Sequence, residues 1–146
     1  MTEATVTLVD GMQFAAETAS GHAFVIDSTP DAGGRNTGPR PMELLAISVA
    51  ACSAMDVISI LRKMQQKVTG LKVHVSGERA EEHPKRFVSL HVEYTIVGYG
   101  VVQERAARAI ELSETKYCSV MASLRPCTPI TTSFTVLEAD EQTLIK

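Results

Sequence analysis

The sequence predicts an α+β fold in which antiparallel strands surround one long, buried helix. Two observations indicate this. Residues 38–64 read GPRPMELLAISVAACSAMDVISILRKM, and after Glu43 this segment is almost entirely apolar or small. Segments on both sides of it alternate apolar and polar residues, with the two-residue period of half-buried strands. At 146 residues the chain is expected to form a single domain, residues 1–146.

The N-terminal region predicts a meander of three strands. Residues 4–9 are rich in Val and Thr, Asp10-Gly11 is a hairpin signal, and residues 12–17 continue as the second strand. Residues 23–27 complete the meander. Residues 28–40 contain three glycines and two prolines, which indicates a loop leading into the long helix.

The long helix is expected to begin at Pro41, because a fixed φ and a missing N–H suit the first helical position. Three basic residues and then Thr69-Gly70 indicate its end. Its uncharged window, residues 44–55, is too short for a bilayer span of about 20 residues, and Asp56 follows it. We therefore expect a core helix wrapped on all sides. At about 42 Å it would cross the domain, so a second subunit should cover part of it.

The C-terminal half predicts further strands and helices. Residues 71–75 and 88–96 alternate as an antiparallel pair, and residues 101–116 carry one helical apolar stripe. Residues 117–124 indicate a short helical turn. Residues 130–137 read as the last strand, followed by a polar tail.

Composition excludes several classes of partner. The net charge of −3 gives no electrostatic argument for nucleic acid or an anionic membrane. The N-terminus lacks the basic and apolar regions of a secretory signal, so a cytoplasmic location is expected. In that reducing compartment the three cysteines are expected to be free or catalytic thiols, and none of them form a Cys-x-x-Cys motif.

Cys52, in the middle of the long helix, is the main candidate for chemistry. A free thiol has a pKa of about 8.5, and burial keeps it protonated, so a reactive Cys52 needs a cation. Arg35 and Arg40 are the nearest in sequence, and Glu43 could orient one of them. The residues alone leave open that Cys52 is only a small buried hydrophobe.

Other sites have weaker support. His74 and His91 lie on the polar faces of neighbouring strands and could meet there, but no ligand pattern indicates a metal. Gly33-Gly34 lacks the strand and helix context of a nucleotide-binding loop, so no cofactor is expected. Cys127 is interpreted as a spare thiol, with the alternative that it is a resolving partner.

Several motifs together resemble one known family. These are GPRPMELL followed by Ala50-Ala51-Cys52, ILRKM, GERAEEHP between the strands, and KYCSV around Cys118. The chain resembles the OsmC/Ohr family of thiol-dependent peroxidases, particularly its YhfA-like branch. The resemblance implies an intertwined α+β homodimer with the long helices packed between the sheets and the active sites at the subunit interface.

The same resemblance implies roles for the cysteines. Cys52 matches the peroxidatic cysteine and Cys118 the resolving cysteine, which would form a disulfide after attack on a hydroperoxide, and a small dithiol would reduce that disulfide. An arginine would hold the thiolate and a glutamate would hold the arginine. The family's glutamate aligns with Met42, one position before Glu43, and Ser119-Val120 replaces its usual Pro-Tyr.

The leading hypothesis is therefore a hydroperoxide reductase of oxidative or osmotic stress defence, acting on organic hydroperoxides. One alternative is a non-catalytic protein that binds an apolar ligand or senses redox state on the same fold. Another is a hydrolase that uses Cys52 with a histidine base, although no histidine is near either cysteine in sequence.

Overall fold

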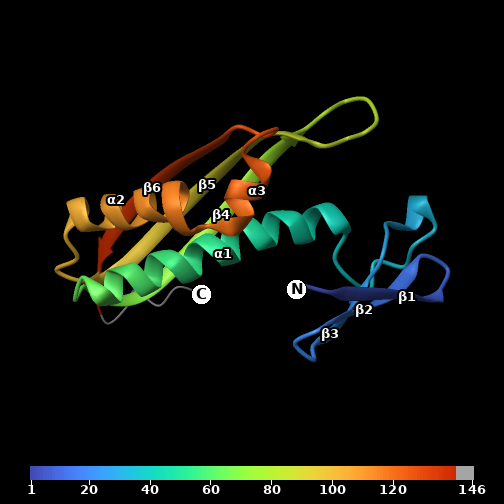
Figure 1. Ribbon diagram of the computed structural model, residues 1–146, viewed down its shortest axis with the longest axis horizontal. Helices are drawn as coiled ribbons and strands as arrows, with labels where there is room; N and C mark the ends of the chain where they lie inside the picture. The colour runs from blue at the N-terminus through green and yellow to red at the C-terminus, as the bar shows by residue number, and fades with distance from the viewer. Residues whose placement is uncertain (141–146) are drawn as a thin grey trace. The chain divides into compact units, whose positions relative to one another are not determined.

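The computed structural model describes residues 1–140, which Figure 1 shows with the chain's secondary structure. The predicted polar tail, residues 141–146, lies outside the described residues. Contacts divide the chain into two compact units, residues 1–45 and 46–146. Each is described by itself, and the assignment of the whole chain to one domain stays a prediction.

The first unit contains the predicted meander. Its three antiparallel strands, β1 (Ala4–Asp10), β2 (Gln13–Thr18) and β3 (Ala23–Ile26), lie in the order β1-β2-β3. Gly11 turns the first hairpin with a φ of 55°, a left-handed conformation that glycine adopts without strain. The following loop contains one short 3-10 helix, η1 (Pro30–Ala32).

The side chain of Asp27 holds this loop in place through hydrogen bonds. Its buried carboxylate accepts hydrogen bonds from the backbone N–H groups of Ser28, Arg35 and Thr37, and from the Thr37 hydroxyl at 2.6 Å. The Thr37 hydroxyl bond contributes most, and together these bonds hold the pKa of Asp27 well below its ordinary value. The sequence pattern gave no indication of this role, because Asp27 read only as the end of a strand.

We predict that Asp27→Asn lowers the thermal unfolding midpoint near pH 7 and has a smaller effect near pH 3. Because the folded-state pKa is depressed, the stabilisation by ionised Asp27 is present above its unfolded pKa of about 3.9 and is lost as the pH falls. Unfolding of both chains followed by circular dichroism measures this, with Glu17→Gln as an exposed control. An equal difference at the two pH values would contradict it.

The long helix, α1 (Pro41–Lys63), begins where predicted but ends earlier than Thr69-Gly70. Gln65 takes a left-handed φ of 58°, which stops the helix, and a strand begins at Lys67. Gly70 does not cap a helix. It lies at a register shift inside that strand, and glycine often marks such bulges. The helix therefore has 23 residues, about 34 Å at 1.5 Å per residue.

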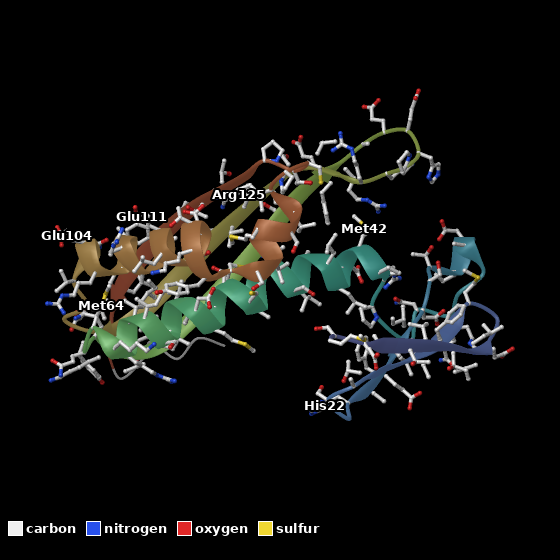
Figure 2. The ribbon with its side chains drawn as sticks, viewed as in Figure 1. His22, Met42, Met64, Glu104, Glu111 and Arg125 are labelled. Atoms are coloured by element: carbon white, nitrogen blue, oxygen red, sulfur yellow. The ribbon has the colours of Figure 1, made fainter. Side chains whose placement is uncertain are left out.

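A basic side chain covers the end of α1. The guanidinium of Arg105 donates a hydrogen bond of 2.7 Å to the carbonyl of Met64, the residue that follows α1 and is labelled in Figure 2. A cation at this end also complements the helix dipole. The start is closed by Glu43, whose carboxylate accepts the backbone N–H of Arg40 at 2.9 Å in the manner of a capping box.

The second unit is built on a three-stranded sheet. The strands β4 (Lys67–Arg79) and β5 (Phe87–Tyr99) form the predicted antiparallel pair. The last strand, β6 (Ile130–Glu138), lies beside β5 and runs parallel to it, unlike the antiparallel sheets expected from the sequence. A parallel neighbour needs a crossover, and the helical segments between β5 and β6 provide it.

That crossover contains three helical segments. They are α2 (Gln103–Leu112), a π-helical turn η2 (Ser113–Tyr117) and α3 (Ser119–Leu124). The single helix predicted for residues 101–116 is thus an α-helix that continues as a π turn. Figure 1 shows α1, α2 and α3 on one side of the β4-β5-β6 sheet.

The core of this unit lies between the helices and the sheet. Buried residues come from alternate positions of β5, from α2 and α3, and from one stripe of α1: Leu90, Val92, Tyr94, Ile96, Ala106, Ala109, Ile110, Met121, Val49, Ser53, Val57 and Leu61. On α1, Ile47 and Met55 are 56% and 70% exposed. The expectation that α1 is wrapped on all sides is therefore not met within one chain, because the helix buries only one face.

The buried stripe also bears on the membrane question. By length and composition alone, α1 is apolar enough to cross a membrane. Its buried stripe nevertheless packs inside the protein and consists of Val49, Ser53, Val57 and Leu61. The helix also contains a charged residue, Asp56, within its length. The helix is therefore a core helix that keeps one apolar face uncovered in the single chain.

Candidate active site

Two of the three cysteines lie together. The Sγ atoms of Cys52 and Cys118 and a carboxylate oxygen of Asp56 are all within 4.8 Å of one another. Cys52 is partly exposed, Cys118 is only 2% exposed, and both are free thiols. Cys127 is exposed, and its thiol donates a hydrogen bond to the carbonyl of Leu124. The structure thus brings together the two cysteines that the resemblance paired.

Local backbone geometry places all three groups. Cys52 and Asp56 are four residues apart on α1, so their side chains lie on the same face of the helix. Cys118 follows the π turn, and its backbone N–H bonds to the carbonyl of Ser113 at 2.9 Å. Its sulfur caps α3 by accepting the N–H of Met121 at 3.4 Å. The extra residue of the π turn therefore fixes where this sulfur lies.

A chain of hydroxyl groups leads through the core to Asp56. The Tyr94 hydroxyl contacts the Ser53 hydroxyl, which lies 3.0 Å from that of Ser113, and Ser113 donates to Asp56 at 3.1 Å. Each hydroxyl has one proton and an ionised carboxylate only accepts. Because Ser113 gives its proton to Asp56, it must accept from Ser53, and Ser53 must accept from Tyr94. Every donor in this chain therefore points toward the carboxylate.

Burial sets the charge states around the thiols. It raises the pKa of Cys118 well above its ordinary value, and neighbouring Cys52 and Asp56 act in the same direction. Burial likewise raises the pKa of Tyr94 to about 12, so this phenol keeps its proton at physiological pH. Cys118 is thus a thiol in the resting protein, and Tyr94 is a permanent donor at the start of the hydroxyl chain.

The basic residue that follows α3 is paired with an acidic side chain. Arg125, labelled in Figure 2, follows α3 and lies 3.5 Å from the carboxylate of Glu114. Glu114 also accepts a hydrogen bond from Thr132. Within residues 1–140, no basic side chain forms an ion pair with Asp56.

The two predicted arginines belong to residues 1–45. The guanidinium of Arg35 forms an exposed ion pair with Asp10 at 2.9 Å. That of Arg40 lies 3.9 Å from Glu43, the pairing in which a glutamate could orient an arginine. The role of Arg35, Arg40 or Glu43 at the Cys52 thiolate stays a prediction.

Asp56 is the functional candidate that sequence reasoning missed. In the sequence it follows the uncharged window of the long helix, where it serves only as evidence against a membrane span. Its spacing of four residues from Cys52 was the available signal, because this spacing places two side chains on one helix face. The contribution of Ser113 and Tyr94 could not be read from spacing, since it depends on the packing of η2 and β5.

The two histidines do not face each other directly. His74 lies opposite Glu93 and His91 opposite Ser76 in the β4-β5 register. His91 instead hydrogen-bonds the hydroxyls of Thr131 and Ser133 on β6. The expectation of no metal stays a prediction.

A groove opens beside Asp56. It encloses about 400 Å³ between α1 and the α2-η2 segment. Its lining is mixed, with apolar or aromatic residues first and polar or charged residues after them: Ile60, Met64, Leu112 and Tyr117, then Asp56, Ser59 and Lys63. Tyr117 directly precedes Cys118 in the chain, so the groove lies next to the thiol cluster.

Comparisons with known proteins identify the family of the chain. The family model described as OsmC-like protein matches residues 33–133. The chain is 37% identical to Protein YhfA of Escherichia coli K12 over 94% of this chain and 99% of that protein. A crystal structure of a hypothetical protein from Aquifex aeolicus is 32% identical, with a TM-score of 0.84 over 96% of this chain and 98% of that one.

A more distant structure shows the same fold. It is an organic hydroperoxide resistance protein from Elizabethkingia anophelis, 22% identical, with a TM-score of 0.66 over 92% of this chain and 96% of that one. The α+β arrangement of two small sheets and a long helix is therefore shared across these proteins.

Proposed function

The chain belongs to the OsmC-like family, and we propose that it is a thiol-dependent peroxidase that reduces organic hydroperoxides. The observation that carries this proposal is the pair of free thiols, Cys52 and Cys118, whose sulfurs lie within 4.8 Å. A disulfide needs the sulfurs to approach to about 2.05 Å, a movement that side-chain rotation can contribute to. Some structural relatives are named organic hydroperoxide resistance proteins.

The partly exposed Cys52 is the nucleophile in this proposal. Its thiolate attacks the peroxide oxygen that carries the hydrogen, and the O–O bond breaks, so that Cys52 becomes a sulfenic acid and the departing alkoxide takes a proton from solvent to leave as the alcohol. The buried Cys118 then attacks the sulfenic sulfur and releases water. A small dithiol reduces the resulting disulfide by thiol-disulfide exchange. Arg35 or Arg40, oriented by Glu43, would stabilise the initial thiolate.

The substrate class follows from the groove beside Asp56. The apolar part of its lining, Ile60, Met64 and Leu112, suits an alkyl chain better than hydrogen peroxide, which has no apolar part to bury. Such an activity fits oxidative or osmotic stress defence in the cytoplasm. No nucleic acid or membrane partner is part of the proposal.

The same groove favours one alternative, a non-catalytic protein that binds an apolar ligand or senses redox state. Nothing about a groove of about 400 Å³ demands turnover. This alternative predicts retention of an apolar ligand, or a single oxidation of Cys52, without continued consumption of peroxide in the presence of a dithiol.

We predict that the native chain consumes an organic hydroperoxide over many turnovers when a small dithiol is supplied. Cys52→Ser should lose this activity completely. Cys118→Ser should accumulate a sulfenic acid on Cys52 that a dimedone probe traps, because its resolving thiol is missing. Peroxide consumption and intact mass follow the two steps, with Cys127→Ser as a control expected to keep turnover.

The outcomes separate the two functions. Turnover that is the same in native chain and Cys52→Ser would contradict the peroxidase. Oxidation of Cys52 by one equivalent without further turnover, with several dithiols tested, would favour the redox sensor.

We further propose that two copies of the chain form a homodimer through the uncovered face of α1. Ile47 and Met55 are exposed there at 56% and 70%, and burying a large apolar side chain contributes about 1.5–3 kcal/mol. An intertwined dimer is the family arrangement suggested by the sequence resemblance, and it would cover the helix face that one chain leaves open.

Sedimentation velocity tests the dimer. The native chain should sediment with twice the 15.8-kDa mass of one chain. Met55→Lys should shift the population toward monomer, because it would place a charge in the interface. Ala107→Lys, at an exposed position of α2, is the matched control and should remain dimeric. A native chain that is monomeric at micromolar concentration would contradict the proposal.

A further inference from the structure

Asp56 lies beside both thiols, where its negative charge is unfavourable for either thiolate. Its carboxylate oxygen is within 4.8 Å of the sulfurs of Cys52 and Cys118. A negative charge at this distance disfavours a thiolate, since like charges repel. Asp56 therefore cannot serve to stabilise the reactive form of either cysteine, and its position requires another explanation.

The hydroxyl chain holds Asp56 as an oriented acceptor. With Ser113 donating to one oxygen, and Ser53 and Tyr94 donating behind it, no donor in the chain has a second proton to offer. The other carboxylate oxygen remains available for an incoming proton. Such outer hydrogen bonds fix the orientation of a reactive group before any reaction begins.

The step that needs a proton acceptor is the attack by Cys118. This thiol is buried, and burial together with Cys52 and Asp56 favours its protonated form, although its sulfur accepts a hydrogen bond from the Met121 N–H. Only a thiolate is an effective nucleophile. Cys118 must therefore lose its proton as it attacks.

We propose that Asp56 shuttles the proton in the closure of the Cys52-Cys118 disulfide. As the Cys118 sulfur bonds to the sulfenic sulfur of Cys52, its proton passes to the carboxylate of Asp56. The S–O bond of the sulfenic acid breaks, and the departing hydroxide takes the proton back from Asp56 and leaves as water. The sulfurs end as a disulfide, and Asp56 ends ionised as it began. This inference rests on the proposed peroxidase function.

The separation of up to 4.8 Å is longer than a hydrogen bond, which requires about 2.6–3.2 Å between heavy atoms. Catalytic hydrogen bonds are often long before the reacting complex forms, and one water can bridge such a gap. Formation of the sulfenic acid also adds a polar oxygen to the Cys52 sulfur. The geometry therefore permits the transfer after the first oxidation.

Asp56→Asn tests the shuttle by the sign of its effect. Asparagine keeps the size of the side chain and can still accept from Ser113, but it cannot take a proton. Rapid mixing with one equivalent of an organic hydroperoxide, quenched and followed by intact mass, resolves sulfenic acid formation from disulfide closure. We expect closure to slow on the order of 100-fold, the range of general acid-base catalysis.

A purely electrostatic role predicts the opposite result. Removing the negative charge favours the Cys118 thiolate, so closure in Asp56→Asn would become faster. For the shuttle we also expect closure in the variant to accelerate with rising pH, as Cys118 deprotonates without help, more steeply than in the native chain. Closure that is unchanged or faster in Asp56→Asn would overturn the proposal.

Further variants separate chemistry from packing. Asp56→Glu retains a carboxylate and should recover part of the closure rate. Ser113→Ala keeps Asp56 but loses one hydrogen bond, so it should slow closure much less than Asp56→Asn, and an equal loss would contradict the shuttle. Glu111→Gln, on the exposed side of α2, should close at the native rate. Circular dichroism confirms the fold of each variant.

The test also distinguishes the shuttle from the function on which it rests. If Cys52 in the native chain is not oxidised by the hydroperoxide, the peroxidase proposal itself fails. If Cys52 is oxidised and Asp56→Asn closes as fast as the native chain, only the shuttle fails.

Discussion

The chain of hydroxyl groups from Tyr94 to Asp56 is the interaction on which the candidate site depends. Through Ser53 and Ser113 it joins α1 to β5 and to η2 across a largely apolar core. Burying these polar groups without partners would cost about 1–3 kcal/mol each, so the elements must meet in the one arrangement that satisfies all of them. That arrangement also sets Cys52 and Asp56 opposite Cys118.

The same arrangement places the carboxylate of Asp56 beside two thiols, where its negative charge disfavours either thiolate. The two sulfurs and the Asp56 carboxylate lie close together. Among the described residues of the same unit, no cation forms an ion pair with Asp56. Cys118 remains a protonated thiol, because burial and these neighbours raise its pKa. A peroxidatic Cys52 needs the opposite state, and in the proposed mechanism an arginine favours that state while Asp56 acts in the second step.

Much of the fold could be predicted from residue patterns, because periodicity and turn residues act locally. The Asp10-Gly11 hairpin, the start of α1 at Pro41 and the alternating strands were confirmed. The predicted end of α1 was wrong. Glycine is common just after the end of a helix, but Gly70 lies at a bulge inside β4. The parallel direction of β6 is a property of the crossover and has no signature in the strand itself.

The site was less accessible to sequence reasoning for a physical reason. Cys52 and Cys118 could be paired only through the resemblance to a family, since 66 positions separate them and no local pattern links them. Asp56 had a local signal in its spacing from Cys52, but its role depends on Ser113 and Tyr94, which only tertiary packing brings to it. Polar residues in an apolar helix should therefore be interpreted together when they lie on the same face of the helix.

The most direct measurement of the central claim is a disulfide map of the native chain after one equivalent of an organic hydroperoxide. Digestion without a reductant, followed by mass spectrometry of the peptides, identifies which cysteines are joined. The account predicts a link between Cys52 and Cys118 within one chain, with Cys127 still a free thiol. A link from Cys52 to Cys127, or an oxidised Cys52 that forms no disulfide, would contradict it.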